Sequence, residues 1–542
     1  MNTNRTIRNS ILTVGLAALL SACPSSSPQS GVLPVSGSTG DGSTGDNANQ
    51  GQGTATAAGH AVFPEEAFRN GQPKPTAARP FNLPGINQFK LGGIDVFLVE
   101  RHDLPTISVE LNFDGGTAND RIGREGTAGV CMSMVSEGTK KLDKLAFEEA
   151  LADMASGISS YAGSESQGVS MYTLSKNFDA TLALYIDTLV EPGFRDSELS
   201  RMVKRRLESL KQAKGSPGSV AGRLVRNIVY GPKHAFGKIT SEKSLGKIKL
   251  NDCKAHHKAY VKPNGARLFV VGDMTQAQLT AKFAPLLAKW KGSPKKVTKV
   301  GKPQSRKGRV FFVDIPGAAQ SSIYIAHKGP GRQDPGYYAN QMMSGVLGGG
   351  FSSRINMNLR EDKGYSYGAR GSFSYNRHFG TFMASSSVRS DSTRQSLDEL
   401  FMEISDLQKG KKPARAEELQ REKNGSILGL PARFATASQV LSVYRGLQYY
   451  GLPMTYYVEY GKYIDAVTLE QVNAAAAKLL HSEDAIVVVV GDGSKKQIRR
   501  DDKKDVATDA TLLDSLKALA ASEMGGKGKL VILNVDGNPI RK

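Results

Sequence analysis

The chain has 542 residues, more than one ordinary domain requires, and its composition is that of a globular protein. Its lysines and arginines give a formal net charge of +20. In a cytosolic protein this excess would first suggest nucleic-acid binding. The N-terminus indicates export instead, so we do not expect nucleic acid among the partners.

Residues 1–23 are typical of an export signal. Arg5 and Arg8 precede an apolar run, residues 11–20, which is too short to span a bilayer. The run leads into Leu-Ser-Ala-Cys, which resembles the lipobox of bacterial lipoproteins. That resemblance implies a lipoprotein signal peptide with lipidation at Cys23. The alternative is an ordinary secretory signal in which this cysteine is incidental.

Residues 24–77 are expected to form a flexible tether, because most of this segment is polar and glycine-rich and cannot pack a core. A tether behind a lipidated cysteine would let the folded body stand off the membrane. No Asp follows Cys23, which favours a periplasmic protein anchored by lipid to the outer membrane of a Gram-negative bacterium. The positive charge would suit the anionic envelope surface.

Two further cysteines, Cys131 and Cys253, lie in apolar, helix-like segments. In an oxidising compartment they could pair. Their apolar surroundings favour two buried free thiols, which is our expectation.

The most informative pattern is an internal repeat. Residues 250–273, LNDCKAHHKAYVKPNGARLFVVGD, and residues 469–492, LEQVNAAAAKLLHSEDAIVVVVGD, both predict a helix, a turn, a β-strand and Gly-Asp. Thr468 and Gln471 form a capping-box pattern before the second helix. The apolar strand at residues 485–490 suits burial on both faces.

Other features recur in the same order along the chain. They are the helical stripes at 178–189 and 397–404, the helix starts SELSR at 197–201 and EELQR at 417–421, and the strands at 107–113 and 321–327. We therefore expect an α+β protein with two copies of one unit, each with a sheet packed with helices. The expected segments are a first copy at 78–293, a linker at 294–306, a second copy at 307–495 and a C-terminal tail at 496–542. The first copy would begin with a hairpin that turns at Gly92 and Gly93, and the tail would carry one short helix and an extended end.

Residues 347–367, LGGGFSSRINMNLREDKGYSY, carry the most specific motif. They resemble the pattern L-G-G-G-x-x-S-R-L-x-x-x-L-R-E-x-x-G-L-x-Y of the pitrilysin/insulinase-like peptidases, the M16 family. The two-copy layout and the strands that end in V-V-G-D agree with this resemblance, which covers about residues 80–495. It implies two homologous M16-type domains that form half of a clamshell.

In that family an active subunit carries the zinc signature H-x-x-E-H on the first helix of the first copy. Two histidines bind the zinc ion, and the glutamate activates the bound water. The resemblance aligns this signature with residues 126–139, where the first His falls on Gly129, the Glu on Met132 and the second His on Ser133. None of the three can bind zinc as required, so we expect a degenerate zinc site whose space apolar side chains fill.

The rest of the chain gives no substitute for these ligands. The third family ligand, a downstream Glu, falls near Glu208 or Ser209, and one carboxylate alone does not hold a catalytic metal. No two of the eight histidines are three or four residues apart. The adjacent His256 and His257 would point about 100° apart on a helix and are expected to be polar helix positions. We therefore expect no metal and no cofactor on this chain.

The second copy keeps an Arg and a Tyr, Arg360 and Tyr367. In two-chain bacterial members of the family, an Arg and a Tyr at this spacing lie on the non-catalytic subunit and project into the chamber that the catalytic partner closes. An Arg can donate paired hydrogen bonds to peptide carbonyls, and a Tyr hydroxyl can stabilise a developing oxyanion. The alternative is a surface Arg paired with Glu361 or Asp362, next to a half-buried Tyr.

Gly348, Gly349 and Gly350 are expected to allow a tight turn and the approach of a peptide backbone. A purely structural turn before a helix is the alternative.

The predicted function is that of a non-catalytic, substrate-binding subunit, inactive alone. Its partner would be a catalytic M16 subunit that bears H-x-x-E-H and zinc, and the pair would degrade short unfolded peptides. The alternative is a non-enzymatic envelope scaffold or peptide-binding protein with the same fold. A self-sufficient zinc peptidase is disfavoured.

Overall fold

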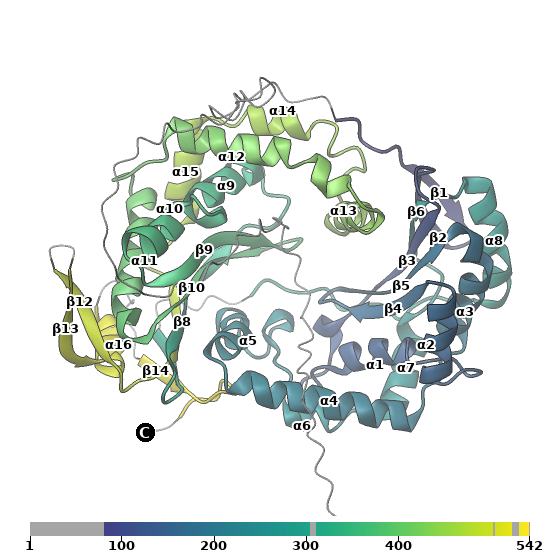
Figure 1. Ribbon diagram of the computed structural model, residues 1–542, viewed down its shortest axis with the longest axis horizontal. Helices are drawn as coiled ribbons and strands as arrows, with labels where there is room; N and C mark the ends of the chain where they lie inside the picture. Colours follow the sequence, from purple (N-terminus) through teal and green to yellow (C-terminus); the bar gives the residue numbers. More distant parts are fainter. Residues whose placement is uncertain (1–80, 304–309, 502–503, 523–529, 541–542) are drawn as a thin grey trace, which may run out of the picture. The chain divides into compact units, whose positions relative to one another are not determined.

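Two six-stranded mixed sheets organise the folded part of the chain (Figure 1). The computed structural model describes residues 81–303, 310–501, 504–522 and 530–540. The expected signal peptide, its lipidation site Cys23 and the tether at 24–77 lie outside the described residues.

The first sheet has the strand order β1-β2-β6-β3-β5-β4. Only the β2–β6 pair is parallel. The predicted hairpin joins β1 to β2 and turns at Gly92, whose φ of +60° favours glycine. The strands are β1 (Asn87–Leu91), β2 (Ile94–Glu100), β3 (Thr106–Asp114), β4 (Gly157–Ala162), β5 (Ser166–Leu174) and β6 (Arg267–Gly272).

Four helices cover one face of the first sheet and bury its apolar side chains: α1, α2, α3 and α8. Local signals set their ends: the Asp143 side chain caps α2, and Thr275 with Gln278 forms a capping box at α8. The helices of this copy are α1 (Thr127–Val135), α2 (Lys144–Asp153), α3 (Phe178–Val190), α4 (Asp196–Lys214), α5 (Pro217–Tyr230), α6 (Glu242–Leu245), α7 (Leu250–Tyr260) and α8 (Gln276–Lys289).

The second sheet repeats this arrangement in the order β14-β7-β11-β8-β10-β9. As predicted, β11 is buried along its whole length. The extended end of the predicted tail forms β14, which pairs in parallel with β7 at the position that β1 has in the first sheet. The tail is therefore part of the second sheet. The strands are β7 (Val310–Asp314), β8 (Gln320–Gly329), β9 (Ser366–Tyr375), β10 (Gly380–Arg389), β11 (Ile486–Gly491) and β14 (Leu530–Leu533).

The helices of the second half follow those of the first in the same order, which confirms the repeat. The Thr468–Gln471 capping box is present at α15. Between β11 and β14 lie a separate two-stranded sheet, β12 (Lys496–Asp501) and β13 (Lys504–Thr511), and the predicted tail helix. The helices are α9 (Tyr337–Ser344), α10 (Arg354–Asn356), α11 (Thr393–Gln408), α12 (Ala416–Leu428), α13 (Ala437–Tyr450), α14 (Tyr460–Asp465), α15 (Leu469–Leu479) and α16 (Leu512–Ala521).

Helix α5 belongs to the first copy but packs on the second sheet (Figure 1). Val220 and Leu224 share one buried cluster with Val488 of β11. Pro217 occupies the first position of this helix, and Gly231 ends it at φ +86°.

Helix α13 makes the reciprocal exchange and packs on the first sheet. Val440 and Leu447 of α13 share a buried cluster with Phe97 of β2. An ion pair of 2.9 Å between Arg445 of α13 and Glu110 of β3 supports the same contact. Because each sheet is covered by a helix of the other copy, the described residues from 81 to 540 belong to one compact unit.

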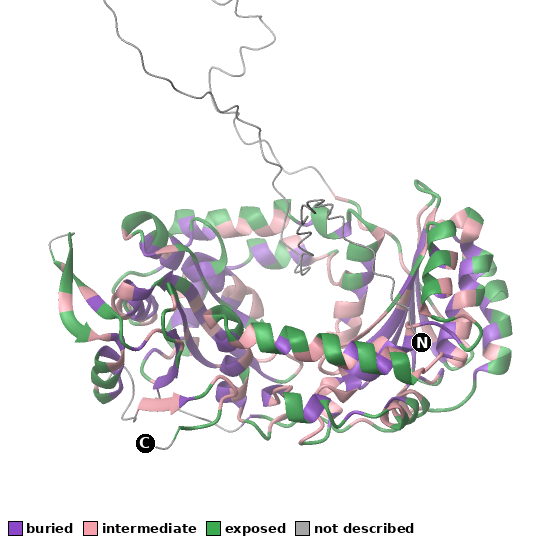
Figure 2. Ribbon diagram, turned by 60° about the horizontal axis from the view of Figure 1, so that its bottom comes forward, coloured by how far each residue is buried: buried purple, intermediate pink, exposed green. Residues whose placement is uncertain are grey.

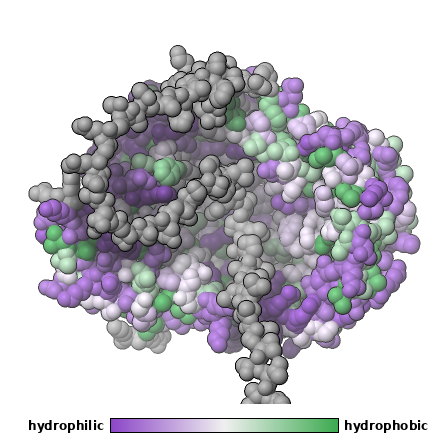
Figure 3. Space-filling model, viewed as in Figure 1, coloured by the Kyte–Doolittle hydropathy of each residue, from purple (hydrophilic) through white to green (hydrophobic). Residues whose placement is uncertain are grey.

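Burial follows this layering. Figure 2 shows buried residues concentrated on the strands and exposed residues on the outward sides of the helices. Over α2, α3 and α8 the surface is mainly hydrophilic, with hydrophobic residues scattered among the hydrophilic ones (Figure 3). Among the helices that the structure describes, none is both long and apolar enough to cross a bilayer.

Candidate functional site

The three degenerate zinc-site positions lie on α1, as predicted. Met132 is completely buried in the core between α1 and the first sheet, where it packs as an apolar side chain. The hydroxyl of Ser133 donates a hydrogen bond of 2.9 Å to the carbonyl oxygen of Gly129 within the helix. No side chain of the three offers a metal an imidazole or a carboxylate.

A guanidinium group contacts the two positions where the family places its histidines. Arg206 of α4 donates from Nη2 to the Gly129 carbonyl oxygen at 3.0 Å and to the Ser133 hydroxyl at 2.9 Å. A Cβ atom at Gly129 would lie only 3.3 Å from Nη1 of Arg206, so even the smallest side chain there would crowd the arginine. A side chain at position 129 would therefore require the guanidinium of Arg206 to shift.

The charge of Arg206 opposes a bound cation. Burial lowers the pKa of its guanidinium, and the neighbouring Arg205 lowers it further, but arginine keeps its proton in proteins. A fixed positive charge at this place repels Zn²⁺. Arg206 therefore places a positive charge beside the two positions where the family has its histidines. Sequence reasoning considered Glu208 and Ser209, two and three residues further along α4, and missed Arg206.

The two adjacent histidines, His256 and His257, make hydrogen bonds within the first copy. His256 Nε2 lies 2.8 Å from Gln167 Oε1, and His257 Nε2 lies 2.9 Å from the carbonyl oxygen of Leu189. Burial lowers the pKa of His256 to about 4, so its ring is neutral at neutral pH. Within the described ranges, no group of three or more His, Cys, Asp or Glu side chains is placed to hold a metal ion.

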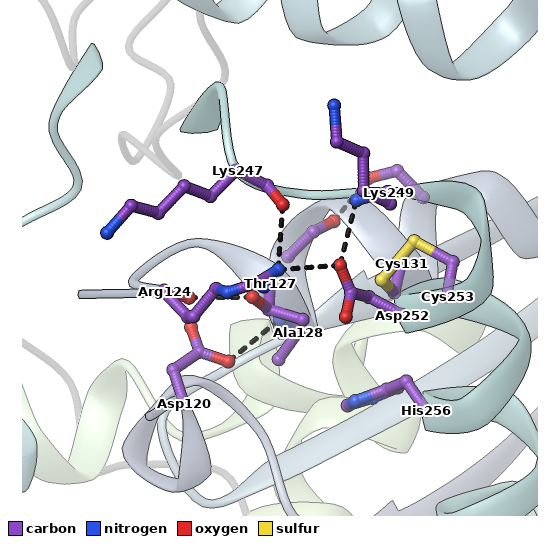
Figure 4. Close-up of a disulfide and its surroundings, with 12 residues drawn as sticks. Asp120, Arg124, Thr127, Ala128, Cys131, Lys247, Lys249, Asp252, Cys253 and His256 are labelled. Carbon is purple, nitrogen blue, oxygen red and sulfur yellow. Dashed lines mark hydrogen bonds and ion pairs between the residues drawn. A yellow bond between two sulfur atoms is a disulfide. The ribbon is translucent and has the colours of Figure 1, made fainter. Parts of the chain in front are cut away.

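Cys131 of α1 and Cys253 of α7 form a disulfide (Figure 4). The prediction of two free thiols is therefore wrong. Both residues are buried, as expected from their apolar surroundings. The two helices nevertheless pack so closely that the Cα atoms are 4.5 Å apart, within the range of a disulfide.

The glycine-rich motif of the second copy is held by a buried ion pair. Arg354 of α10 donates from Nε and Nη2 to both carboxylate oxygens of Glu418 on α12, at 2.9 and 2.7 Å. It also donates to the carbonyl oxygens of Lys412 and Pro413. This paired geometry fixes the short α10 against α12.

Two π-helical turns flank α10, at Gly345–Gly349 and Met357–Asp362. π-Helical turns are rare in proteins, and those that occur are often found at functional sites. The second turn contains Arg360, and the chain then enters β9, the edge strand of the second sheet, where Tyr367 lies.

Arg360 and Tyr367 lie side by side. Arg360 donates from Nη1 to the backbone carbonyl oxygen of Tyr367 at 3.2 Å, and its Nε lies 3.0 Å from Glu361 Oε1. No described residue bonds Nη2 of Arg360, which leaves one end of the guanidinium free. The Tyr367 side chain is 87% exposed. The expected pairing of the arginine with Glu361 is present, but the half-buried tyrosine of the same alternative is not.

Two further exposed apolar side chains surround this pair. The guanidinium of Arg360 lies over the ring of Phe351, 4.9 Å from its centroid, and Phe351 is 60% exposed. Met357, one turn before Arg360, is 36% exposed. Exposed apolar groups around a polar donor are typical of a binding surface. Phe351 was not singled out in the sequence, although it directly follows the three glycines.

The three glycines differ in role. Gly348 forms an isolated β-bridge with Gly371 of β9, and a Cβ atom at Gly348 would overlap the Gly371 backbone nitrogen. Gly348 is therefore required for packing. Gly349 and Gly350 are exposed, and a Cβ atom at Gly350 would meet nothing within 4 Å.

Two family models match the chain. "Insulinase (Peptidase family M16)" matches residues 96–239, and "Peptidase M16 inactive domain" matches residues 247–426. Together they cover more than half of the chain. The chain belongs to the M16 peptidase family. The expected α+β fold with two M16-type domains is thereby confirmed.

Similar proteins agree with this M16 assignment. The chain is 23% identical over 402 residues to "Non-peptidase homolog YmxG" of Helicobacter pylori, covering 72% of this chain and 89% of that protein. Among solved structures, it resembles the peptidase M16 inactive domain from Pseudomonas fluorescens, with a TM-score of 0.70, 24% identity and coverage of 77% of this chain and 100% of that one. It also resembles the periplasmic protease PqqL from Escherichia coli, with a TM-score of 0.63, 14% identity and coverage of 79% and 50%.

The similar proteins and the absence of zinc ligands at Gly129, Met132 and Ser133 support the same conclusion. A non-catalytic role fits this M16 chain.

Proposed function

We propose that this M16 chain is the substrate-gripping subunit of a two-chain peptidase. A separate M16 subunit with H-x-x-E-H supplies the zinc ion and the general base. Arg360 and Tyr367 of this chain hold the peptide, and the two subunits together form a clamshell that degrades short unfolded peptides.

The exposed Arg360–Tyr367 pair carries this proposal. The free Nη2 end of Arg360 can donate to a peptide carbonyl oxygen, and the exposed Tyr367 hydroxyl can donate to the carbonyl that is attacked or to its oxyanion. The ring of Phe351 beneath the guanidinium orients the arginine for this role. The exposed side chains of Phe351 and Met357 would add apolar contacts to a bound peptide.

The comparison with PqqL supports the need for a second chain. This chain matches half of that longer periplasmic protease. A peptidase built on the same plan from shorter chains needs a second M16 chain for the other half. Because Gly129, Met132 and Ser133 offer no zinc ligands and Arg206 places a positive charge beside them, the second chain would bring the metal.

The proposed location is the periplasm, with lipid anchorage to the outer membrane through Cys23. Support comes from the lipobox-like sequence and from the Cys131–Cys253 disulfide, since disulfides persist in oxidising compartments.

Reconstitution tests the proposal. The purified chain, the H-x-x-E-H subunit from the same genome and their mixture are assayed on a fluorogenic unstructured peptide. We expect cleavage only by the mixture, and a chelator should abolish it. Arg360→Ala and Tyr367→Phe should each lower kcat/KM by about tenfold or more, because each removes a donor to the reacting peptide.

Matched controls keep the test specific. Arg499→Ala on β12 and Tyr463→Phe on α14 alter exposed residues of the same types outside the motif. These variants should match the wild type. If the Arg360 and Tyr367 variants are as active as the controls, the assigned roles are wrong. If the mixture never cleaves peptide, the alternative of an envelope scaffold or peptide-binding protein replaces the proposal.

A further inference from the structure

A groove lies between α4 and α7 in the first copy, remote in sequence from the Arg360–Tyr367 pair. We name it the α4–α7 groove; its volume is about 630 Å³. One wall is a face of α4 that runs from Asp196 to Leu207, about 17 Å at 1.5 Å per residue. The opposite wall is the first turn of α7 with the segment that precedes it. In Figure 2, where α4 runs across the front, most of its outward residues are exposed.

The floor of the groove is apolar. Leu199 is buried, while Val203 and Leu207, on the same face of α4, remain partly exposed to solvent. They belong to the buried cluster formed by α1, α4 and α7. Burying the remaining apolar area of such side chains is worth about 25 cal/mol per Å². The groove therefore offers an apolar ligand a hydrophobic gain.

The rim of the groove is positive. Lys204 of α4, with Lys249 and Lys254 at the start of α7, lines it, and all three are exposed. No described carboxylate forms an ion pair with any of them. The carboxylate of Asp252 accepts hydrogen bonds from Arg124 and from the Lys249 backbone nitrogen instead (Figure 4). Asp196 is the one acidic residue in the lining, so the positive charge of the rim is not neutralised.

The disulfide fixes the wall that carries two of these lysines. Cys253 lies in the first turn of α7, next to Lys254, and is joined to the buried helix α1 through Cys131. This wall of the groove is therefore covalently tied to α1, against which α4 packs. A preformed groove lowers the entropy that a ligand must lose to bind.

We propose that the α4–α7 groove binds an acidic amphipathic helix of a partner protein. The concave apolar floor accepts a row of leucine-like side chains at helical spacing, and Asp or Glu on the flanks of that helix pairs with Lys204, Lys249 and Lys254. A flat anionic membrane fits a groove poorly, because its apolar layer does not reach a recessed floor. A second copy of this chain is disfavoured because its net charge of +20 repels an identical chain.

The test uses the full chain and a fluorescein-labelled peptide of Leu and Glu, about 18 residues long, with Leu at every third and fourth position. A scrambled peptide of equal composition is the control for charge alone. We expect the amphipathic peptide to bind at least about tenfold tighter than the scrambled one. The Lys204→Glu, Lys249→Glu and Lys254→Glu triple variant should weaken binding by about tenfold or more, since three attractions become repulsions.

A charge-matched variant separates the groove from the overall field. Lys409→Glu, Lys411→Glu and Lys478→Glu change the net charge equally at exposed lysines elsewhere. This variant should bind the amphipathic peptide within about twofold of the wild type. Equal binding of both peptides, equal effects of both triple variants, or phosphatidylglycerol vesicles that bind at the groove lysines and displace the peptide would each overturn the proposal.

Discussion

Removal of the Cys131–Cys253 disulfide should destabilise the fold by several kcal/mol. The bond joins residues that are 122 apart in sequence, and the loop-closure entropy of a ring of that size corresponds to about 5 kcal/mol at 25 °C. Both sulfur atoms lie in the buried cluster of α1, α4 and α7, so replacement by alanine also removes a small amount of packing. We expect the Cys131→Ala/Cys253→Ala variant to lose roughly 4 to 5 kcal/mol of unfolding free energy.

The chain offers a direct optical probe for this measurement. Trp290 is its single tryptophan, and it is buried against Phe113 in the core of the first sheet, with ring centroids 6.0 Å apart. Urea unfolding followed by Trp290 fluorescence therefore reports on the half that contains the disulfide. Either single replacement breaks the same bond, so both single variants should approach the double variant.

Reductant provides the control. Dithiothreitol should shift the unfolding transition of the wild type to that of the variant and leave the variant unchanged. If the double variant unfolds at the same urea concentration as the oxidised wild type, the bond does not restrain the unfolded chain and the reasoning fails.

Three further comparisons test the site. Gly348→Ala should lower the free energy of unfolding by about 1 to 3 kcal/mol because the new Cβ atom overlaps the backbone of β9. Gly350→Ala should change the free energy of unfolding by less than about 0.5 kcal/mol. Urea unfolding compares the two variants, and equal effects would contradict the proposed packing role of Gly348. Arg206→Leu should cost about 1 to 3 kcal/mol because it removes two hydrogen bonds from a charged donor. Elemental analysis should find no stoichiometric zinc before or after the change, and one zinc ion per wild-type chain would refute the degenerate zinc site. Burial would raise the pKa of Glu418, but the hydrogen bonds from Arg354 and Arg415, together with the charge of Arg354, outweigh burial and lower the pKa to about 2, below the unfolded value of about 4.3. Stability from this pair is therefore present above about pH 4.5 and lost as the pH falls toward 2. The loss between pH 5 and 3 should be smaller in Arg354→Met, and an unchanged pH profile would contradict the assignment.

The sequence predicted the repeat and most of its elements because burial leaves a periodic pattern. The apolar run of β11 and the capping box at Thr468 are local signals, and the structure follows both. The motif at residues 347–367 drew attention to Arg360 and Tyr367, and the structure shows that Arg360 donates a hydrogen bond to the backbone carbonyl oxygen of Tyr367. In each case residues near in sequence carried the information.

The features that sequence analysis missed depend on how distant segments pack. The surroundings of Cys131 indicated burial but not the distance between α1 and α7, so its pairing was not apparent. The contact of Arg206 with α1 depends on the placement of α4 across that helix. The exchange of α5 and α13 likewise leaves no periodic signal, because an amphipathic helix shows that it has an apolar face but not which sheet covers it.

The reciprocal placement of α5 and α13 has a consequence for the history of the chain. A gene that encoded one copy alone would produce a sheet with one uncovered apolar face and one helix without a surface to cover. Two such molecules could complete each other by donating that helix in both directions, as in a symmetric domain-swapped pair. The present polypeptide is in effect such a pair joined end to end, so neither half is expected to fold when expressed alone.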